Sequence, residues 1–329
     1  MDAPVLFYKG KKDLIQCELC SHLCILSEGK WGRCKVRTVH DGQLIATNFG
    51  KVTSAAFDPI EKKPLYHFMP GTCILSIGSF GCNMTCSFCQ NYEISQHQPH
   101  SKTLPVEQLC QILSEQPNHV GVAFTYNEPF MWYEYVYEAA KKIKQTMPHQ
   151  KIVMVTNGYI NQSPLMKLLP YIDAMNIDLK GYTNQYYRKI CGAKLNPVLE
   201  TIKLVANKVH LEITTLLVSD ENDSLEEVEE IAKFIASINP NIPFHLSRYF
   251  PKYKLNHQAT EIEVLIKAKA IARNYLNYVY IGNVANLNQN TYCPDCQELL
   301  IERNLYESKV FLTEPKCPTC GAKIEMILT

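Results

Sequence analysis

Residues 82–89 read Cys-Asn-Met-Thr-Cys-Ser-Phe-Cys, in which Cys82, Cys86 and Cys89 form a C-x3-C-x2-C pattern that chance rarely produces from 14 cysteines in 329 residues. Thiolates at these separations can bind one metal centre, but three are one fewer than a closed [4Fe–4S] cluster or structural zinc site needs. The pattern therefore predicts an iron–sulfur cluster in which one iron keeps a position open. Two alternatives remain: Cys73 or Cys191 could close the site for electron transfer or zinc, or the cysteines could be buried as small apolar residues.

Outward from this run, apolar and β-branched segments alternate with amphipathic ones. The expected strands are 73–79, 120–126, 152–156, 174–179, 210–218, 244–247 and 278–282. The expected helices are 105–115, 129–145, 164–169, 196–207, 224–238 and 260–274. Strand followed by helix about six times predicts an α/β fold built from parallel βα units, as an open or partial barrel. We place this barrel at residues 71–285, between a cysteine-rich N-terminal extension at 1–70 and a C-terminal module at 286–329.

Polar residues follow several of the expected strands. The cysteine run follows the first strand, Asn127 and Glu128 the second, Asn157 the third, Asp178 and Lys180 the fourth, and Arg248 the sixth. In parallel βα folds the functional residues gather where the strands end. A single Asp or Asn at such a place is more often a helix cap or turn residue. Their joint occurrence around an open cluster nevertheless predicts a shared site.

The C-terminal region contains two C-x2-C pairs, Cys293/Cys296 and Cys317/Cys320, with 20 residues between them. This spacing is typical of a zinc ribbon, in which four thiolates enclose a tetrahedral Zn²⁺. Such an ion stabilises a hairpin whose own core is thin. Rubredoxin-like iron and unliganded thiols are the alternatives.

A third cluster lies near the N-terminus and consists of Cys17, Cys20, Cys24 and Cys34. Four cysteines within 18 positions indicate another closed four-thiolate site. The spacing does not decide between zinc and a second iron–sulfur cluster. Zinc is the preferred interpretation.

Composition limits the function classes. With 46% hydrophobic and 20% charged residues the chain is an ordinary globular sequence, and its net charge of +1 makes nucleic acid an unexpected partner. No apolar run reaches the roughly 18 residues of a membrane span, and the first residues do not resemble a secretory signal. We therefore expect a cytoplasmic protein without a membrane partner, where closely spaced cysteines bind metals instead of forming disulfides.

The cysteine run, with aromatic Phe88 before its last cysteine, resembles the signature of radical S-adenosylmethionine (SAM) enzymes. The resemblance extends over nearly the whole chain, and with the N-terminal cysteine pattern the chain resembles the AmmeMemoRadiSam system radical SAM enzymes, relatives of the pyruvate formate-lyase-activating enzymes. The segments that carry it are DPIEKKPLYH (58–67), LSIG (75–78), CQN (89–91), TYNEP (125–129), TNGY (156–159), NIDLKG (176–181), HLSR (245–248) and TYC (291–293).

The resemblance implies a [4Fe–4S] cluster on Cys82, Cys86 and Cys89, with SAM chelating the open iron through its amino and carboxylate groups. Reductive cleavage of SAM would then give methionine and a 5′-deoxyadenosyl radical. This radical would abstract hydrogen from an unidentified substrate. The resemblance implies that the SAM ammonium contacts Glu128, beside Asn127, and that the SAM carboxylate contacts Lys180. It also implies that the ribose contacts Asp178 and Asn157 and that the adenine lies near Phe88. The activating enzymes place a SAM-contacting histidine where this chain has Phe250, so Arg248 or His245 is expected to substitute.

The implied partners are an electron donor of the flavodoxin or ferredoxin type and Memo-like and AMMECR-like proteins. Two alternative functions remain open. One is an activase that abstracts hydrogen from a glycine of a glycyl-radical enzyme, which the shared motifs permit. The other is a non-catalytic iron–sulfur or zinc scaffold, which would have no need for Glu128, Asp178 and Lys180 around an open cluster.

Overall fold

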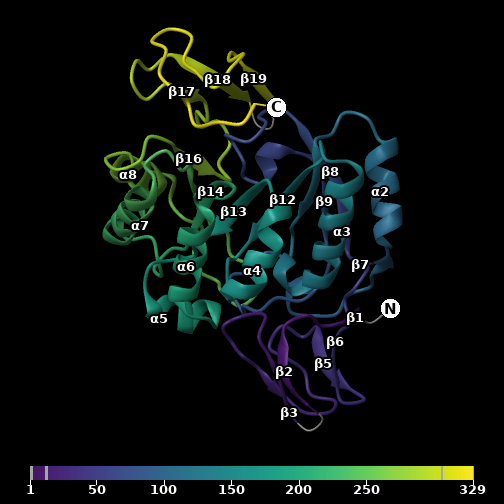
Figure 1. Ribbon diagram of the computed structural model, residues 1–329. Coiled ribbons are helices and arrows are strands. Elements are labelled where there is room, and N and C mark those ends of the chain that lie inside the picture. Colours follow the sequence, from purple (N-terminus) through teal and green to yellow (C-terminus); the bar gives the residue numbers. More distant parts are fainter. Residues whose placement is uncertain (1–2, 12–13, 305–306, 329) are drawn as a thin grey trace.

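An eight-stranded sheet forms the centre of the computed structural model, which describes residues 3–11, 14–304 and 307–328 (Figure 1). Its parallel strands lie in sequence order, and β8 (Ser54–Pro59) pairs antiparallel with the first of them. The parallel strands are β9 (Cys73–Gly78), β11 (Gly121–Phe124), β12 (Lys151–Thr156), β13 (Ala174–Asp178), β14 (His210–Leu217), β15 (Phe244–Arg248) and β16 (Val279–Gly282). Because sequential strands are neighbours, the sheet curls in one direction and ends at β8 and β16 as a partial barrel.

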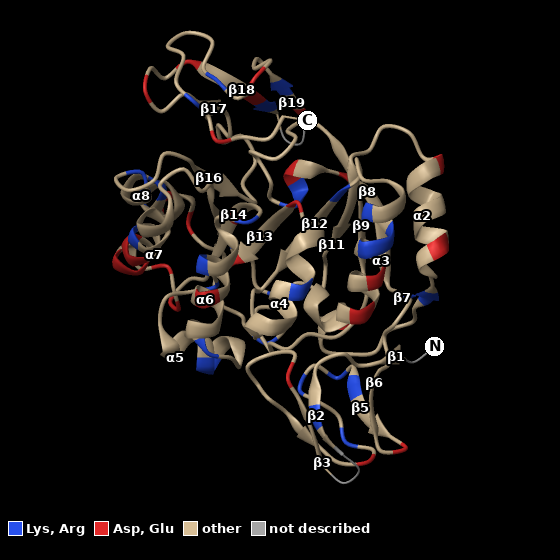
Figure 2. Ribbon diagram, in the orientation of Figure 1, with Lys and Arg blue, Asp and Glu red and all other residues tan. Residues whose placement is uncertain are grey.

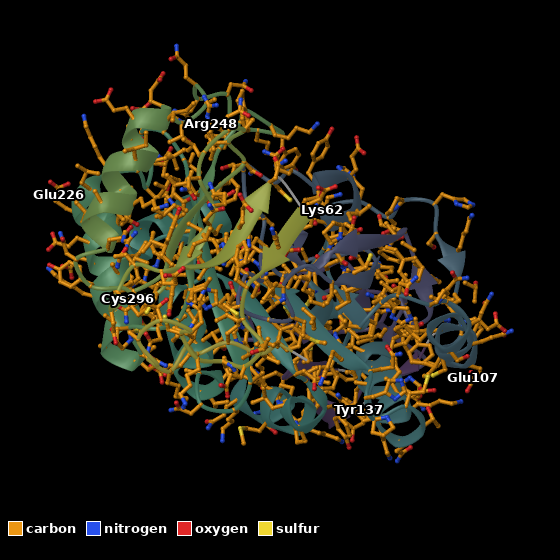
Figure 3. All side chains as sticks on the ribbon, turned by 90° about the horizontal axis from the view of Figure 1, so that it is seen from above. Lys62, Glu107, Tyr137, Glu226, Arg248 and Cys296 are labelled. Atoms are coloured by element: carbon orange, nitrogen blue, oxygen red, sulfur yellow. The ribbon has the colours of Figure 1, made fainter. Side chains whose placement is uncertain are left out.

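Helices follow the strands and cover the outside of the sheet (Figure 1). The longer ones are α2 (Val106–Glu115), α3 (Tyr133–Thr146), α4 (Gln162–Leu168), α6 (Leu195–Val205), α7 (Leu225–Ile238) and α8 (Ile262–Ala272). In α7, Val228, Ile231 and Ile235 are buried at helical spacing, and the hydroxyl of Ser224 caps the first turn by accepting from the Glu227 N–H. Figure 3 shows Glu226 of α7 and Glu107 of α2 at opposite edges of the molecule.

Short helices connect these elements. They are η1 (Ile60–Lys62), α1 (Tyr92–Ser95), η2 (Pro129–Trp132), η3 (Leu169–Tyr171), α5 (Asn184–Tyr186) and the π-helical turn η4 (Tyr187–Cys191). Within the described residues, no helix is long and apolar enough to cross a membrane. Figure 2 shows basic and acidic residues spread over the ribbon, and the sequence contains 33 of the former and 32 of the latter.

The N-terminal region forms small antiparallel sheets at the end of the barrel where the parallel strands finish (Figure 1). Its strands are β1 (Ala3–Pro4), β2 (Tyr8–Lys11), β3 (Leu14–Cys17), β4 (Ile25–Leu26), β5 (Arg37–His40), β6 (Gln43–Ala46) and β7 (Lys51–Val52), the last paired with β10 (Lys102–Thr103). Arg37 and Glu134 of α3 form a buried ion pair with Nη2 and Oε2 2.8 Å apart. This pair fixes the N-terminal region to the barrel.

The C-terminal module lies at the opposite end of the barrel (Figure 1). Its three-stranded sheet contains β17 (Thr291–Tyr292), β18 (Leu299–Asn304) and β19 (Glu307–Val310). The Arg303 guanidinium donates to the Tyr66 carbonyl at 2.7 Å, and the Ile327 N–H donates to the His67 carbonyl at 2.9 Å. The segment before β9 therefore connects this module to the barrel.

The expected partial barrel with cysteine-rich terminal regions is confirmed, and each expected strand and helix of the barrel has a counterpart in the structure. One difference concerns β8, which lies inside the extension predicted at 1–70 but belongs to the central sheet. Three of its six residues are exposed and its one buried residue is Asp58, so its sequence lacks the apolar alternation that marks a strand.

Candidate functional site

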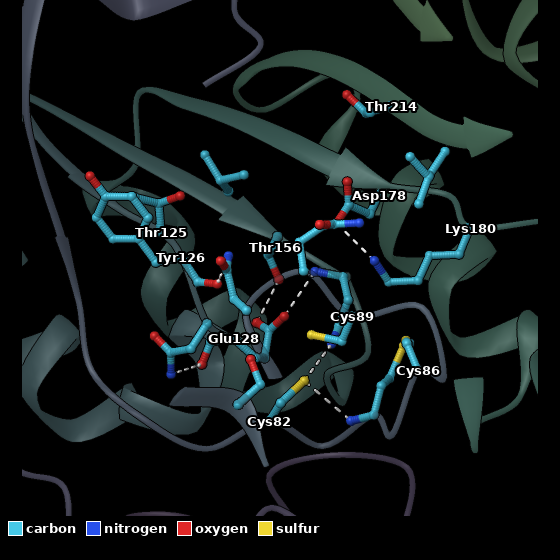
Figure 4. Close-up of a pocket in the computed structure, with 18 of the residues that line it drawn as sticks. Cys82, Cys86, Cys89, Thr125, Tyr126, Glu128, Thr156, Asp178, Lys180 and Thr214 are labelled. Atoms are coloured by element: carbon cyan, nitrogen blue, oxygen red, sulfur yellow. Dashed lines mark hydrogen bonds and ion pairs between the residues drawn. The ribbon is translucent and has the colours of Figure 1, made fainter. Parts of the chain in front are cut away.

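A cavity of about 370 Å³ opens where the parallel strands finish (Figure 4). Its walls come from the cysteine loop, from the ends of several strands and from the segments that follow them. The predicted site residues that line it are Cys82, Cys86, Phe88, Cys89, Asn127, Glu128, Asn157, Asp178 and Lys180. Residues distant in the sequence are thus brought to one place, as the rule for parallel βα folds predicts.

The cysteine loop runs from the end of β9 to α1 and is held from outside by backbone hydrogen bonds. The N–H groups of Thr85 and Ser87 donate to the carbonyls of Cys191 and Ile190, at 2.9 and 3.0 Å. The sulfurs of Cys82, Cys86 and Cys89 face the cavity, and the three do not all lie within 4.8 Å of one another in this described loop. Thiolates that bind different irons of one cluster stand further apart than thiolates that share one ion. The donor set therefore fits a [4Fe–4S] cluster with one iron open.

Glu128 precedes η2 and is 2% exposed. Its Oε1 accepts from the Thr156 hydroxyl at 2.6 Å and the Phe130 N–H at 3.0 Å, and its Oε2 accepts from the Asn157 N–H at 2.8 Å. Burial raises the pKa of Glu128 to about 7, against the lowering effect of these hydrogen bonds. A carboxylate offers about four acceptor positions, so one position toward the cavity is left for a cationic ligand.

Lys180 and Asp178 form an ion pair on the opposite wall, with Nζ and Oδ2 2.9 Å apart (Figure 4). The Lys180 ammonium also lies 5.9 Å from the centre of the Phe88 ring. Burial lowers the pKa of Lys180, but Asp178 and Cys86 outweigh that effect and hold the pKa well above its ordinary value. The cavity therefore has a fixed positive charge facing Glu128.

Asn127 and Asn157 use their amides to hold the cysteine loop. Asn127 accepts from the Ser79 N–H at 3.0 Å and donates to the Gly81 carbonyl at 2.9 Å. Asn157 donates to Cys82 Sγ at 3.6 Å and to the Asn83 side-chain oxygen at 2.9 Å. Both line the cavity, but the predicted ribose contact of Asn157 competes with these bonds.

His245 and Arg248 are not among the described residues that line the cavity. The His245 ring is buried and hydrogen-bonds Glu212 at 2.6 Å, toward the start of β14. Arg248 donates from Nε to the Thr260 carbonyl at 2.8 Å and covers the Phe250 ring at 4.9 Å. The SAM contact expected of Arg248 or His245 therefore has no counterpart in the described lining of this cavity, to which β15 contributes Ser247.

Sequence reasoning gave no role to a second group, in which Lys63 and Tyr126 of the cavity wall contact Asp58 behind them. Asp58 accepts from Lys63 at 2.8 Å and from the Tyr126 hydroxyl at 2.9 Å. Burial raises the pKa of Asp58, but the Lys63 and Tyr126 hydrogen bonds outweigh it and bring the pKa to about 2. Tyr126 has a φ of 72°, a left-handed conformation that costs a non-glycine residue about 1–2 kcal/mol.

Cys191 lies beside Cys86 and lowers the pKa of the Cys86 thiol. Cys191 is not among the described residues that line the cavity. Cys73 begins β9, at the opposite end of that strand from the cysteine loop. Neither position favours a fourth ligand to the open iron.

The four C-terminal cysteines form a compact group. Cys293 and Cys320 have their sulfurs 3.6 Å apart, Cys296 and Cys317 have theirs 3.5 Å apart, and all four sulfurs lie within 4.8 Å of one another. Thiolates bound at about 2.3 Å to one tetrahedral ion lie about 3.8 Å apart. The group can therefore hold a single metal ion.

The N-terminal cysteines Cys17, Cys20, Cys24 and Cys34 also come together and line a small cavity of their own. Cys24 is partly buried, and the other three are buried. Their sulfurs are less closely grouped than those of the C-terminal set.

Comparison with known proteins agrees with this geometry. The sequence profile of the Radical SAM superfamily matches residues 76–235. An uncharacterized protein of Methanocaldococcus jannaschii is 40% identical over 98% of this chain and 99% of its own length. The pyruvate formate-lyase-activating enzyme of Clostridium pasteurianum is 26% identical over 57% of this chain and 83% of its own length. The 4-hydroxyphenylacetate decarboxylase activating enzyme of Clostridium scatologenes is 26% identical over 46% of this chain and 52% of its own length.

Solved structures show the same fold. The crystal structure of Streptococcus suis SuiB bound to S-adenosylmethionine superposes with a TM-score of 0.51. It covers 67% of this chain and 50% of the SuiB chain, at 14% sequence identity.

Proposed function

The chain belongs to the radical SAM superfamily, and on that basis we propose that it reductively cleaves SAM and uses the resulting radical to abstract hydrogen from a substrate. The observation that carries the proposal is the placement of three cysteines, a carboxylate and an ammonium around one cavity. Cys82, Cys86 and Cys89 would hold a [4Fe–4S] cluster, whose fourth iron would bind the amino and carboxylate groups of SAM. The bound cluster would supply the electron that cleaves SAM.

The residues around the cavity would bind and orient SAM. Glu128 presents its remaining acceptor position to the SAM ammonium, and Lys180 presents a cation to the SAM carboxylate. Phe88 is 5% exposed and offers an apolar ring for the adenine and a shield against water. Asp178 offers its second carboxylate oxygen to a ribose hydroxyl.

The substrate class is proposed from the sequence resemblance. The segments shared with the AmmeMemoRadiSam system enzymes cover both cysteine-rich ends and the barrel, and the archaeal relative likewise matches 98% of the chain. We therefore propose a substrate connected with Memo-like and AMMECR-like partner proteins, and an electron donor of the flavodoxin or ferredoxin type.

A glycyl-radical-enzyme activase is the second candidate, supported by the two clostridial activating enzymes. The sequence identity to each of them is 26%, over 46% and 57% of this chain. These matches therefore include less of the terminal regions than the match to the archaeal relative does. Incubation with SAM, reductant and candidate partner proteins separates the two functions. A glycyl radical in electron paramagnetic resonance (EPR) spectra, formed in proportion to 5′-deoxyadenosine, supports the activase.

The C-terminal group is proposed as a structural zinc site. The close approach of its four sulfurs supports a single ion, and the module has only a small core of its own. A protein with this many metal-binding thiolates also needs a reducing compartment, which supports the cytoplasm as its location.

Product analysis tests the proposed function. The protein is reconstituted anaerobically with iron and sulfide, reduced with dithionite, and supplied with SAM. Wild type and the control Cys110→Ala, which changes a cysteine on α2, are expected to produce 5′-deoxyadenosine and methionine. Cys86→Ala is expected to produce neither. A scaffold function would be indicated if wild type formed no cluster under conditions that load other radical SAM proteins.

A further inference from the structure

The four N-terminal cysteines surround a space instead of meeting around one point. Cys17, Cys20, Cys24 and Cys34 line an enclosed cavity of about 10 Å³, the size of one water molecule. No three of their sulfurs lie within 4.8 Å of one another, although all four belong to the described part of the chain. Thiolates that share one Zn²⁺ are in contact and leave no space between them. The quartet is therefore too open for a single ion.

The other two cysteine groups serve as comparisons within the same chain. The C-terminal sulfurs meet the 4.8 Å criterion for one ion, whereas the three sulfurs of the Cys82 loop do not. A [4Fe–4S] cluster attaches each thiolate to a different iron, so its thiolates are spread apart. Its cubane core fills a space between the sulfurs, whereas a single ion draws them together. The N-terminal quartet thus resembles the cluster site more than the single-ion site.

The N-terminal region also has less need of a structural ion. Its apolar residues, among them Ile15, Leu26 and Val36, belong to the same continuous core as the barrel. The C-terminal module, by contrast, has a small separate core that includes two of its cysteines. Structural zinc is found where the local core is too thin to fold alone. That reason applies to the C-terminal group only.

The surroundings of the quartet are those of a buried anion. Arg37 is 1% exposed, lines the cavity, and its Nε has no hydrogen-bond partner within the described residues. Both Nη atoms of Arg37 pair with Glu134, which leaves the Nε–H of the guanidinium without a partner among these residues. An arginine N–H available beside four thiolates fits a metal centre of net negative charge.

A short path joins the quartet to the Cys82 loop. The His22 ring lines the N-terminal cavity, and its Nε2–H donates to the Asn83 carbonyl at 2.7 Å. On the other side of Cys82, a Cβ added to Gly81 would stand 2.8 Å from the Cys34 carbonyl. The residues before and after Cys82 therefore both contact the N-terminal cysteine region.

We propose that Cys17, Cys20, Cys24 and Cys34 bind a second [4Fe–4S] cluster that passes electrons to the cluster at Cys82. The binding of the second cluster stands on its own, and the transfer of electrons rests on the proposed function. A low-potential one-electron donor, such as a reduced flavodoxin, reduces the second cluster from the 2+ to the 1+ state. The second cluster returns to 2+ when it gives that electron to the first. The path through His22 and Asn83 connects the two.

Metal content tests the binding. The full-length protein is purified anaerobically, reconstituted, and analysed for iron and zinc together with Mössbauer and EPR spectra. A Cys82→Ala/Cys86→Ala/Cys89→Ala variant is expected to retain about four irons in a [4Fe–4S] cluster and about one zinc. The control Cys110→Ala is expected to contain about eight irons and one zinc. A triple variant with about two zinc ions and no iron would overturn the proposal, whether or not the wild type cleaves SAM.

Rapid freeze-quench EPR tests the transfer of electrons. The cluster at Cys82 is identified by the change of its signal when SAM is added, and its reduction by reduced flavodoxin is followed in time. A Cys20→Ser/Cys34→Ser variant is expected to slow that reduction at least about tenfold while the SAM-dependent change remains. If this variant does not fold, His22→Phe leaves all ligands in place and is expected to slow the reduction in the same direction. Unchanged rates in a folded variant would contradict the relay, and the metal count would still decide the binding site.

Discussion

Glu128 shows how one residue can serve both the fold and the ligand. Three of its acceptor positions hold the ends of β11 and β12 together, and the remaining one faces the cavity. Its burial without a countercharge in hydrogen-bond contact keeps its pKa near 7, so a cationic ligand would favour its ionised form. The strand-end rule predicted the place of Glu128 but not these bonds, because they depend on how two loops meet.

Glu128→Gln is expected to weaken SAM binding about tenfold or more, because it replaces a charge-assisted hydrogen bond to the ammonium by a neutral one. Equilibrium dialysis with the reconstituted protein measures the affinity. Glu107→Gln on α2, at an exposed position, is the matched control and should leave it unchanged. Equal affinities for both variants would remove Glu128 from the SAM site.

Two predicted site residues, His245 and Arg248, lie outside the described cavity lining, and their individual contacts explain why. His245 and Arg248 belong to β15, and the sequence shows that a strand ends there. It does not show which partner each side chain finds, and both find partners away from the cavity: Glu212 for His245 and the Thr260 carbonyl for Arg248. Asp178 and Lys180 line the cavity because Asp178 ends β13 and Lys180 follows it by two residues.

Among the elements, the end of β9 sets the position of the TYNEP segment. A Cβ on Gly78 would stand 2.5 Å from the Thr125 carbonyl and 3.0 Å from the Tyr126 ring. The close approach lets Tyr126 adopt its left-handed conformation and reach Asp58. The strand itself was predicted from its apolar run, but this contact between strands was not visible in the sequence.

Gly78→Ala is expected to destabilise the protein by about 1–3 kcal/mol and to disturb the SAM site, because the backbone of Thr125 must move. Gly282→Ala, whose added Cβ would meet nothing closer than 3.6 Å, is expected to change stability by less than about 0.5 kcal/mol. Chemical denaturation of both variants measures the difference. Equal stabilities would contradict the steric account.

A buried group joins the segment before β9 to β14. Glu212 accepts from the N–H groups of Tyr66 and His67 and from the rings of His210 and His245. The His67 ring hydrogen-bonds the Tyr280 hydroxyl at 2.8 Å. Burial lowers the pKa of His67 to about 3. The end of the DPIEKKPLYH segment therefore anchors the region before β9 to β14 and β16.

Stability is expected to fall as pH is lowered from 7 to 5. The unfolded His67 takes up a proton near its ordinary pKa of about 6.5, whereas the folded one does not, so the unfolded state binds more protons in this range. The loss is up to about 2 kcal/mol at pH 5 and continues toward the folded pKa. Denaturant titrations of wild type and His67→Gln measure it. A variant with the same pH dependence as wild type would assign the effect elsewhere.

At the scale of the whole molecule, the two cysteine-rich regions cover opposite ends of one barrel (Figure 1). The N-terminal region contacts the cysteine loop, and the C-terminal module contacts the segment around Tyr66 and His67. The spacing of the cysteines predicted three metal-binding groups. It did not predict their placement, because spacing contains no information about which surfaces meet.

Removal of the C-terminal metal is expected to unfold that module and leave the barrel folded, since the barrel has its own core. Hydrogen exchange after treatment with a zinc chelator should show lost protection in β17 and β18 and retained protection in β12 and β13. A Cys296→Ser variant should show the same pattern without chelator. Loss of protection throughout the chain would show that the module is required for the whole fold.

The central claim is that the cluster at Cys82, Cys86 and Cys89 has one iron open to SAM. Electron–nuclear double resonance of the reduced protein, with SAM labelled by ¹⁵N in its amino group and ¹⁷O in its carboxylate, measures this directly. The account predicts that both labels couple to the cluster in wild type and in Cys110→Ala. A reduced cluster without coupling to either label would show that all four irons are closed, and would contradict the account.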